Sequence, residues 1–191
     1  MCSITSKILK TTKNIYPSKD AEIILLIAHK NYPNNSNISS SGITFYDKYK
    51  INEIAFLSNE FSLPLFSIIS LILQSHIKAS LLIDKLLNAK NGMYFFAKYL
   101  QNYHNMFLIN ECGNEKNIQN ILSDFPKQKV LLIGSEHCNT LWENRSSIMR
   151  IPHPGNQAYV YKPKDCCDTY FTFTFEDKNS TLTLNDFRIK L

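Results

Sequence analysis

Residues 22–28 have the sequence Glu-Ile-Ile-Leu-Leu-Ile-Ala, in which one acidic residue precedes six consecutive apolar ones. A continuous apolar run of this length is typical of a strand that is buried on both faces, as in a parallel sheet. Three more short apolar runs follow, at residues 106–110 (MFLIN), 129–133 (KVLLI) and 148–152 (IMRIP). We therefore expect four buried strands.

Helical periodicity fills the intervals between these strands. Apolar residues recur at helical spacing within residues 50–61, 64–78, 79–104 and 115–125, with a break expected at Asn91-Gly92. A further short helix is expected after Gly134. This alternation of strands and helices predicts an α/β fold, with an open parallel four-stranded sheet and helices on both of its faces.

The two ends of the chain depart from this alternation. Residues 1–20 are polar and predict an N-terminal arm, either loose or a short helix, ahead of a single domain over residues 21–191. Residues 170–176 (YFTFTFE) and 181–184 alternate between polar and apolar side chains. This pattern predicts a C-terminal β-hairpin, or an edge strand added to the sheet.

Composition excludes several classes of protein. The longest apolar stretch, residues 63–73, is too short to cross a bilayer, so no membrane partner is expected. The odd number of cysteines, five, without any Cys-x-x-Cys pair, argues against a disulfide framework and a structural metal site, and favours a cytoplasmic, reducing compartment. A net charge of +5 is compatible with a phosphate-bearing partner.

Polar residues follow the ends of the predicted strands. His29 and its neighbours follow the first strand, Asn110 ends the second, and His153 follows the fourth within the segment Pro152-His153-Pro154-Gly155. Histidine is suited to proton transfer and hydrogen bonding near neutral pH, and ligand sites of open α/β folds lie just beyond the carboxyl ends of strands. These residues predict a site at that edge, although Asn110 is also a residue type that commonly starts a turn.

The order of these segments resembles the uracil-DNA glycosylase superfamily. Residues 28–33 (AHKNYP) lie where the common family has GQDPYH, and Gly42-Ile43-Thr44-Phe45 is similar to its Gly-Leu-x-Phe segment. A strand ending in asparagine, a strand followed by Gly-Ser (residues 130–137, VLLIGSEH) and a final His-Pro loop complete the set. The Tyr-Pro pair at residues 32–33 and the final loop are closer to the poxvirus branch. The resemblance spans residues 22–160.

The resemblance implies a base-excision DNA repair enzyme that needs no cofactor. Such a hydrolase flips deoxyuridine out of DNA and cleaves its N-glycosidic bond. By this resemblance His153 hydrogen-bonds uracil O2 as the bond breaks, Asn110 recognises the Watson–Crick edge of uracil, and Phe45 stacks on the base. Tyr32 excludes the 5-methyl group of thymine, and His29 belongs to the uracil pocket.

The final loop would contact DNA. The residues implied there are Pro154, Gly155, Asn156, Gln157 and Tyr159. The loop lacks the leucine that the common family inserts into the duplex. Either Tyr159 replaces that wedge, or none is needed on single-stranded DNA.

The catalytic acid of the family is missing. The aspartate that orients water and faces the cation developing on the sugar is replaced by Lys30 or, after a shift of one residue, by Asn31. Two like charges ~4 Å apart cost about 4 kcal/mol at an effective dielectric constant of about 20, so Lys30 would slow the ordinary reaction. Asn31 could instead hold the water. Two other functions therefore stay open: a weak or inactive glycosylase-fold protein that binds DNA or a replication partner, and a base-binding α/β protein unrelated to DNA.

Overall fold

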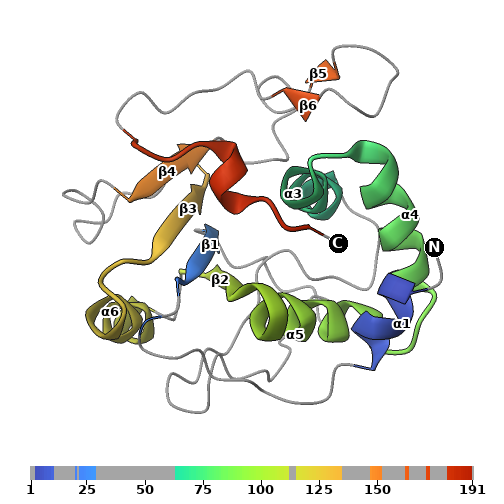
Figure 1. The fold of residues 1–191 in the computed structure, drawn as a ribbon, viewed down its shortest axis with the longest axis horizontal. Coiled ribbons are helices and arrows are strands. Elements are labelled where there is room, and N and C mark those ends of the chain that lie inside the picture. The colour runs from blue at the N-terminus through green and yellow to red at the C-terminus, as the bar shows by residue number, and fades with distance from the viewer. Residues whose placement is uncertain are drawn as a thin grey trace.

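The computed structural model describes residues 3–10, 20, 22–28, 63–111, 115–134, 147–151, 162–163, 171–172 and 180–190. Its centre is an open sheet of four parallel strands in the order β2-β1-β3-β4 (Figure 1). The strands are β1 (Ile24–Ala28), β2 (Met106–Asn110), β3 (Lys129–Ile133) and β4 (Ile148–Ile151). The predicted α/β fold with a parallel four-stranded sheet is confirmed.

The strands are mostly apolar because both faces of the sheet are covered. Alternate residues point to opposite faces, so Leu26 and Leu108 join one core cluster while Leu25 and Phe107 join the other. All four of these side chains are at most 3% exposed. Burial on both faces explains why the sequence shows continuous apolar runs instead of alternation.

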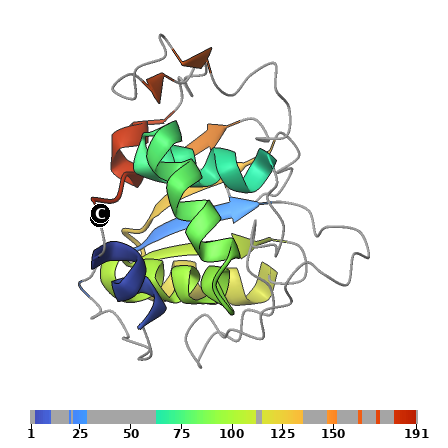
Figure 2. The same ribbon diagram turned by 90° about the vertical axis from the view of Figure 1, so that its right-hand side faces the viewer.

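Helices cover both faces (Figure 2). One face packs against α1 (Ser3–Leu9), α3 (Leu63–Leu73), α4 (His76–Leu87), α5 (Gly92–His104) and the 3-10 helix η2 (Leu184–Phe187). The other face packs against α6 (Glu115–Asp124), which buries Ile118, Ile121 and Leu122. In Figure 2 the larger helical layer lies in front of the sheet and α6 lies behind it. Helix α1 contributes the fully buried Ile8 to the larger layer.

Local backbone signals set the limits of the helices. The break predicted at Asn91-Gly92 is confirmed, because Asn91 adopts the left-handed conformation (φ 57°) immediately before α5 begins. A second break divides the predicted helix over residues 64–78. Gln74 has a φ of 50°, and the Ser75 hydroxyl accepts a hydrogen bond from the Lys78 N–H at 3.1 Å, which caps the start of α4.

The C-terminal region differs from the predicted hairpin. Residues 181–184 form no strand, and η2 follows Thr183 because Thr183 and Asp186 form a capping box. Residues Phe171–Thr172 (β6) instead pair antiparallel with Lys162–Pro163 (β5), in a separate two-stranded sheet. Beyond η2, Ile189 is buried and its N–H donates to the carbonyl of Ile72 at 3.0 Å.

Two expected helices, over residues 50–61 and after Gly134, lie outside the described residues. Within the described part of the chain, no helix is both long enough and apolar enough to cross a membrane.

Candidate functional site

The last residues of the four strands form one row across the sheet. Asn110 is the register partner of Ala28, Ala28 is the partner of Ile133, and Ile133 is the partner of Ile151. The ladder continues one residue further, because the Glu111 N–H donates to the Ala28 carbonyl at 2.7 Å. The carboxyl ends that precede the predicted site residues therefore lie side by side.

This strand order contains a topological switch point. From the central strand β1 the chain passes to β2 on one side, and then crosses to β3 and β4 on the other side. In open α/β sheets, ligands bind outside the carboxyl ends of strands at such a reversal, here between β1 and β3. His29 follows β1 and Gly134 follows β3, so the predicted first motif begins at this point.

Asn110 is a buried amide in this row. It is 0% exposed, and strand alternation places it on the same face as Met106 and Leu108, the face covered by α3–α5. Its position as the last residue of β2, paired with Ala28, agrees with the strand end expected from the sequence. An amide side chain carries both a donor and an acceptor, which can match the donor and acceptor of a flat heterocycle.

Glu111 is a buried acidic residue at the strand ends that the sequence interpretation missed. It is only 2% exposed, although glutamate is rarely fully buried in proteins unless it is paired. Through its backbone bond to Ala28, it lies beside the end of β1. A buried carboxyl group is thus placed next to the strand that leads into Lys30 and Asn31. The sequence signal was an acidic residue directly after an apolar strand.

Gly134 leaves β3 in a conformation that favours glycine. Its φ is +119°, and its N–H donates to the Ile151 carbonyl at 2.9 Å. A Cβ built on Gly134 would meet no described atom within 4 Å. The backbone at the carboxyl end of β3 is therefore open to close approach, as far as the described residues show, which suits a flat ligand.

The remaining predicted site residues lie outside the described residues. They are His29, Lys30, Asn31, Tyr32, Phe45 and His153, with the loop residues Pro154, Gly155, Asn156, Gln157 and Tyr159. The structure places the strands that precede two of these groups: β1 ends at Ala28, next to Asn110, and β4 ends at Ile151, two residues before His153. Their roles stay predictions.

His104, the described histidine with a shifted pKa, lies near the amino ends of the strands, opposite the candidate site. His104 ends α5, just before β2 begins, and its ring makes an edge contact with Tyr99 at 5.2 Å between centroids. Burial lowers the pKa of His104, and the nearby charge of Lys7 lowers it further. Among the described residues, no cluster of three or more His, Cys, Asp or Glu side chains could hold a metal ion.

Comparison of the chain with protein-family models, with curated proteins and with solved structures finds no match.

Proposed function

We propose that this protein is a DNA repair glycosylase that hydrolyses the N-glycosidic bond of deoxyuridine in DNA. The observation that carries the proposal is the buried amide of Asn110, at the carboxyl end of β2 and in register with Ala28. Ala28 is the residue from which the motif His29–Pro33 continues. An amide able to pair with a base, next to the strand that precedes a segment resembling the family's first motif, supports this proposal.

In this proposal, Asn110 discriminates uracil from cytosine. Uracil presents an acceptor at O4 and a donor at N3, whereas cytosine presents a donor and an acceptor at the corresponding positions. A buried amide oriented toward uracil would leave polar groups unpaired with cytosine, and such mismatches give strong discrimination. The base must leave the DNA stack to reach a buried residue, so base flipping is part of the proposal.

His153 supplies leaving-group stabilisation. Water adds to C1′ as the C1′–N1 bond breaks, and the bonding electrons depart with uracil as an anion. A histidine donor at uracil O2 stabilises that charge, and preorganised donors of this kind usually provide the largest single contribution to catalysis. The anion then takes up a proton, and the proton released from the attacking water passes to a base.

Glu111 is a candidate to replace the aspartate that the family's first motif has and this chain lacks. It is buried, and its backbone lies beside Ala28 at the end of β1, the strand from which the sequence continues to Lys30 and Asn31. In the proposal, Glu111 offsets the charge of Lys30 and favours the cation that develops on the sugar. The physical reason is that an opposite charge within about 4–6 Å stabilises the charged form of a neighbouring group.

A second candidate function is DNA binding without catalysis. Lys30 favours it, because a lysine at the acid position would oppose the developing cation while still attracting phosphate. Both candidates require binding to DNA that weakens steeply as salt is added, whereas a base-binding protein unrelated to DNA would show no such dependence.

The test is release of uracil from single-stranded and duplex oligonucleotides that contain one deoxyuridine, detected by alkaline cleavage. His153→Ala and Asn110→Ala should each lower the rate by about 100-fold, the scale expected on losing one preorganised donor. Asn120→Ala, which alters an exposed asparagine on α6, is the matched control and should leave the rate unchanged. Circular dichroism checks that each variant is folded.

Each outcome decides between the candidates. Near-normal rates in both His153→Ala and Asn110→Ala would refute the assignment of the site. DNA binding without uracil release would select the second candidate. If Lys30 occupies the acid position, Lys30→Asp should raise the rate; if Glu111 contributes its charge, Glu111→Gln should lower it.

A further inference from the structure

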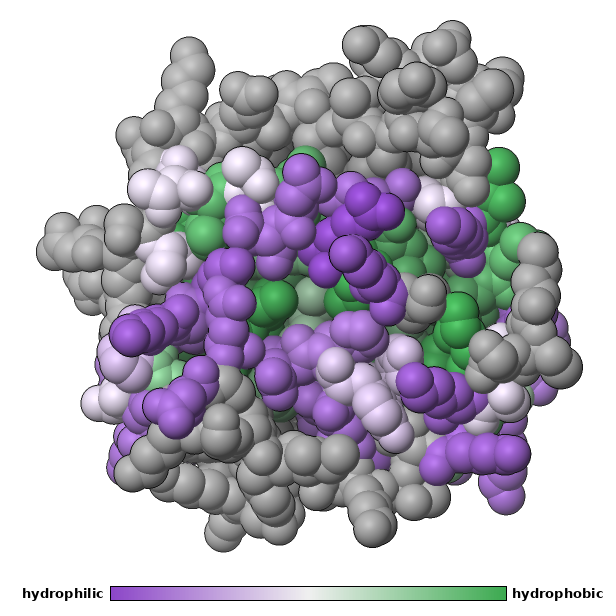
Figure 3. All heavy atoms as spheres, viewed as in Figure 1, coloured by the Kyte–Doolittle hydropathy of each residue, from purple (hydrophilic) through white to green (hydrophobic). Residues whose placement is uncertain are grey.

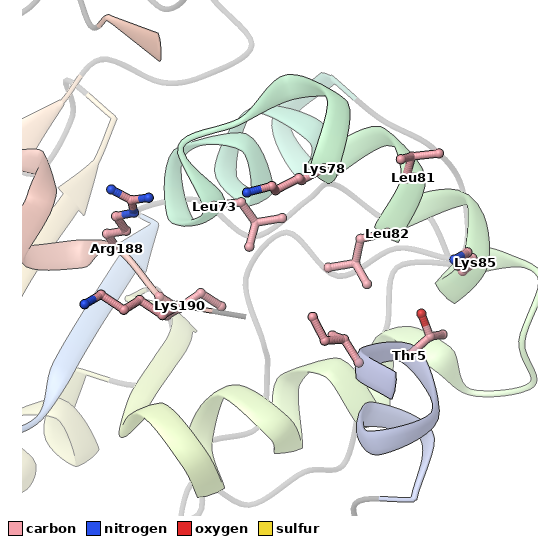
Figure 4. A pocket seen from close by; sticks show the side chains of 10 residues that line it. Thr5, Leu73, Lys78, Leu81, Leu82, Lys85, Arg188 and Lys190 are labelled. Atoms are coloured by element: carbon pink, nitrogen blue, oxygen red, sulfur yellow. The ribbon is translucent and has the colours of Figure 1, made fainter. Parts of the chain in front are cut away.

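A pocket lies on the part of the molecule where α1, α4 and the C-terminal segment (residues 188–190) meet (Figure 4). Its volume is about 380 Å³, within the range of small-molecule sites in proteins. The C-terminal segment continues from η2, where Asp186 contacts Lys129 at the start of β3. This part of the chain is thus tied to the end of the sheet where the parallel strands begin, whereas Asn110 lies at the opposite end, where the strands finish.

The walls of the pocket are apolar. They are formed by Ile4 from α1, Leu73 from α3, Leu81 and Leu82 from α4, and Ile189 from the C-terminal segment. Figure 4 shows Leu73 and Leu82 pointing into the space between these elements. Leu81 is 46% exposed, which is unusual for so large an apolar side chain and leaves it available to a ligand.

Cationic side chains surround these walls. Lys78 and Lys85, about two turns apart on α4, lie on one side, and Arg188 and Lys190 lie across from them on the C-terminal segment (Figure 4). No carboxylate lines the pocket among the residues that the structure describes. In Figure 3, hydrophobic surface shows between hydrophilic residues in the same region, over α4 and beside the C-terminal segment. Apolar walls with a cationic rim are complementary to an amphipathic anion.

The pocket is held open by contacts within the chain. The Ile189 N–H donates to the Ile72 carbonyl at 3.0 Å, which fixes the C-terminal segment against α3. The Gln74 amide Nε2 donates to the carbonyl of Leu184 at 3.3 Å and to Asn185 Oδ1 at 3.1 Å. Because these bonds position the wall before any ligand arrives, a ligand need not order the segment, and the entropic cost of binding is small.

We infer that this pocket binds a small amphipathic anion, an apolar chain with one anionic head group. The chain packs against Leu73, Leu82 and Ile189, and the head group pairs with the cations of α4 and the C-terminal segment. Burial of each methylene group contributes about 0.8 kcal/mol, so a chain of medium length supplies enough binding energy for a measurable site. The inference does not depend on the proposed DNA chemistry, because the pocket and Asn110 use different residues.

The probes are decanoate, decyl phosphate and uncharged decan-1-ol, titrated into the full chain by calorimetry and by methyl NMR. Decanoate or decyl phosphate should saturate a single site and shift the methyl signals of Ile4, Leu82 and Ile189. The stronger of the two identifies the head group as carboxylate or phosphate. Decan-1-ol should bind about tenfold more weakly, because it cannot pair with the cations.

The matched variants separate local charge from net charge. Lys78→Glu combined with Lys85→Glu should weaken binding by about tenfold or more, since both replacements put a negative charge at the rim of the pocket. Lys116→Glu combined with Lys127→Glu changes the net charge equally, at exposed sites in and after α6, and should leave binding unchanged. Leu81→Glu, an exposed position, should also weaken binding without unfolding the chain.

The inference would be overturned by equal losses in the two lysine pairs, by equal binding of decan-1-ol and the stronger anion, or by the absence of saturable binding by either anion. Tight binding of an acidic amphipathic peptide, with no binding of decanoate, would also overturn it and would identify the pocket as a protein-docking site.

Discussion

Replacement of Asp186 by asparagine tests how the C-terminal segment is held on the sheet. One carboxylate oxygen of Asp186 lies 3.0 Å from the Lys129 ammonium, which also contacts Glu22 at 2.8 Å. The other oxygen accepts from the Thr183 N–H at 2.8 Å and from its hydroxyl at 3.0 Å. Because Phe187 directly follows and is fully buried, the contacts of Asp186 anchor a residue of the core.

The expected loss of stability in Asp186→Asn follows from these contacts. Asparagine keeps the shape of the side chain and part of the cap, but it removes the charge. Losing a cap costs about 0.5–2 kcal/mol, and losing a pair of partly exposed charges costs about 0.2–1 kcal/mol. Both side chains are less than one-third exposed (28% for Asp186 and 24% for Lys129), so solvent screens the pair only in part. We expect Asp186→Asn to lower the free energy of unfolding by about 1–2 kcal/mol near pH 7.

The pH dependence gives the sharper test. The backbone hydrogen bond from Thr183 lowers the pKa of the Asp186 carboxyl, and the contact with Lys129 lowers it further. Because the pKa is lower in the folded chain, the unfolded chain binds the proton more tightly. The stabilisation is therefore complete above the unfolded pKa, and it is lost as pH falls through the folded pKa.

Urea unfolding followed by circular dichroism, at intervals from about pH 7 to about pH 2, measures the free energy of unfolding of Asp186→Asn and of the unmodified chain. The gap is the difference between these two free energies. The gap should close in acid, and a double-mutant cycle with Lys129→Met isolates the ion pair. Asp84→Asn, at an exposed carboxylate on α4, is the control and should change the free energy of unfolding by less than about 0.5 kcal/mol near neutral pH. A gap that is absent at neutral pH, or that stays constant into acid, would refute this account.

Three further predictions concern stability measured by the same urea assay. Phe187→Ala should cost about 3–5 kcal/mol, because it empties a fully buried site in the larger core; a cost below about 1 kcal/mol would show that the C-terminal segment is dispensable. Gly92→Ala should cost more than Gly134→Ala. The new Cβ at Gly92 would lie 2.0 Å from the Leu86 carbonyl oxygen, whereas at Gly134 the cost is the positive φ alone, about 1–2 kcal/mol. His104→Gln should flatten the loss of stability on acidification below the ordinary histidine pKa. Burial lowers the folded pKa of His104, so protonation favours the unfolded chain; an unchanged pH profile would contradict this reasoning.

The strands were predictable because each is a short apolar run between polar residues. The predicted runs at residues 106–110 and 129–133 match the observed strands, and the run at residues 22–28 contains β1, since burial on both faces imposes a continuous pattern. The break between α3 and α4 was not predictable in this way. It falls at Gln74, a residue that seldom adopts the left-handed conformation, so no glycine or proline marked it in the sequence.

Local hydrogen bonding explains the error at the C-terminal end. Residues 181–184 alternate as a strand would, and Leu182 and Leu184 do pack against the core. The capping box between Thr183 and Asp186 nevertheless closes a turn and directs Phe187 inward. That box was visible as a threonine followed three residues later by an acidic residue, a pattern that marks the start of a helix.

The only part of the candidate site that could be predicted was the part fixed by the pairing of parallel strands. Strand order and register bring Asn110 next to Ala28, as expected for strand ends that share one edge of a sheet. Glu111 escaped notice because most acidic residues after a strand are solvated, and its burial follows from tertiary packing that no local pattern encodes. Residues 29–41 gave no comparable constraint, since their sequence has no periodicity from which positions could be predicted.

The two edges of the sheet differ in how their charges are used. At the amino ends of the strands, the Lys129 ammonium contacts both Glu22 and Asp186, and burial lowers the pKa of His104. The two contacts of Lys129 serve the fold. At the carboxyl edge, Asn110 and Glu111 are buried polar residues at the end of an apolar strand. Burying an amide and a carboxyl group costs free energy that an apolar pair would avoid. Both residues lie beside the end of β1, at the carboxyl ends of the parallel strands where open α/β sheets bind ligands, and one strand away from the switch point between β1 and β3. The free-energy cost of burying them is the one expected if this end of the sheet serves recognition, as the proposed function requires.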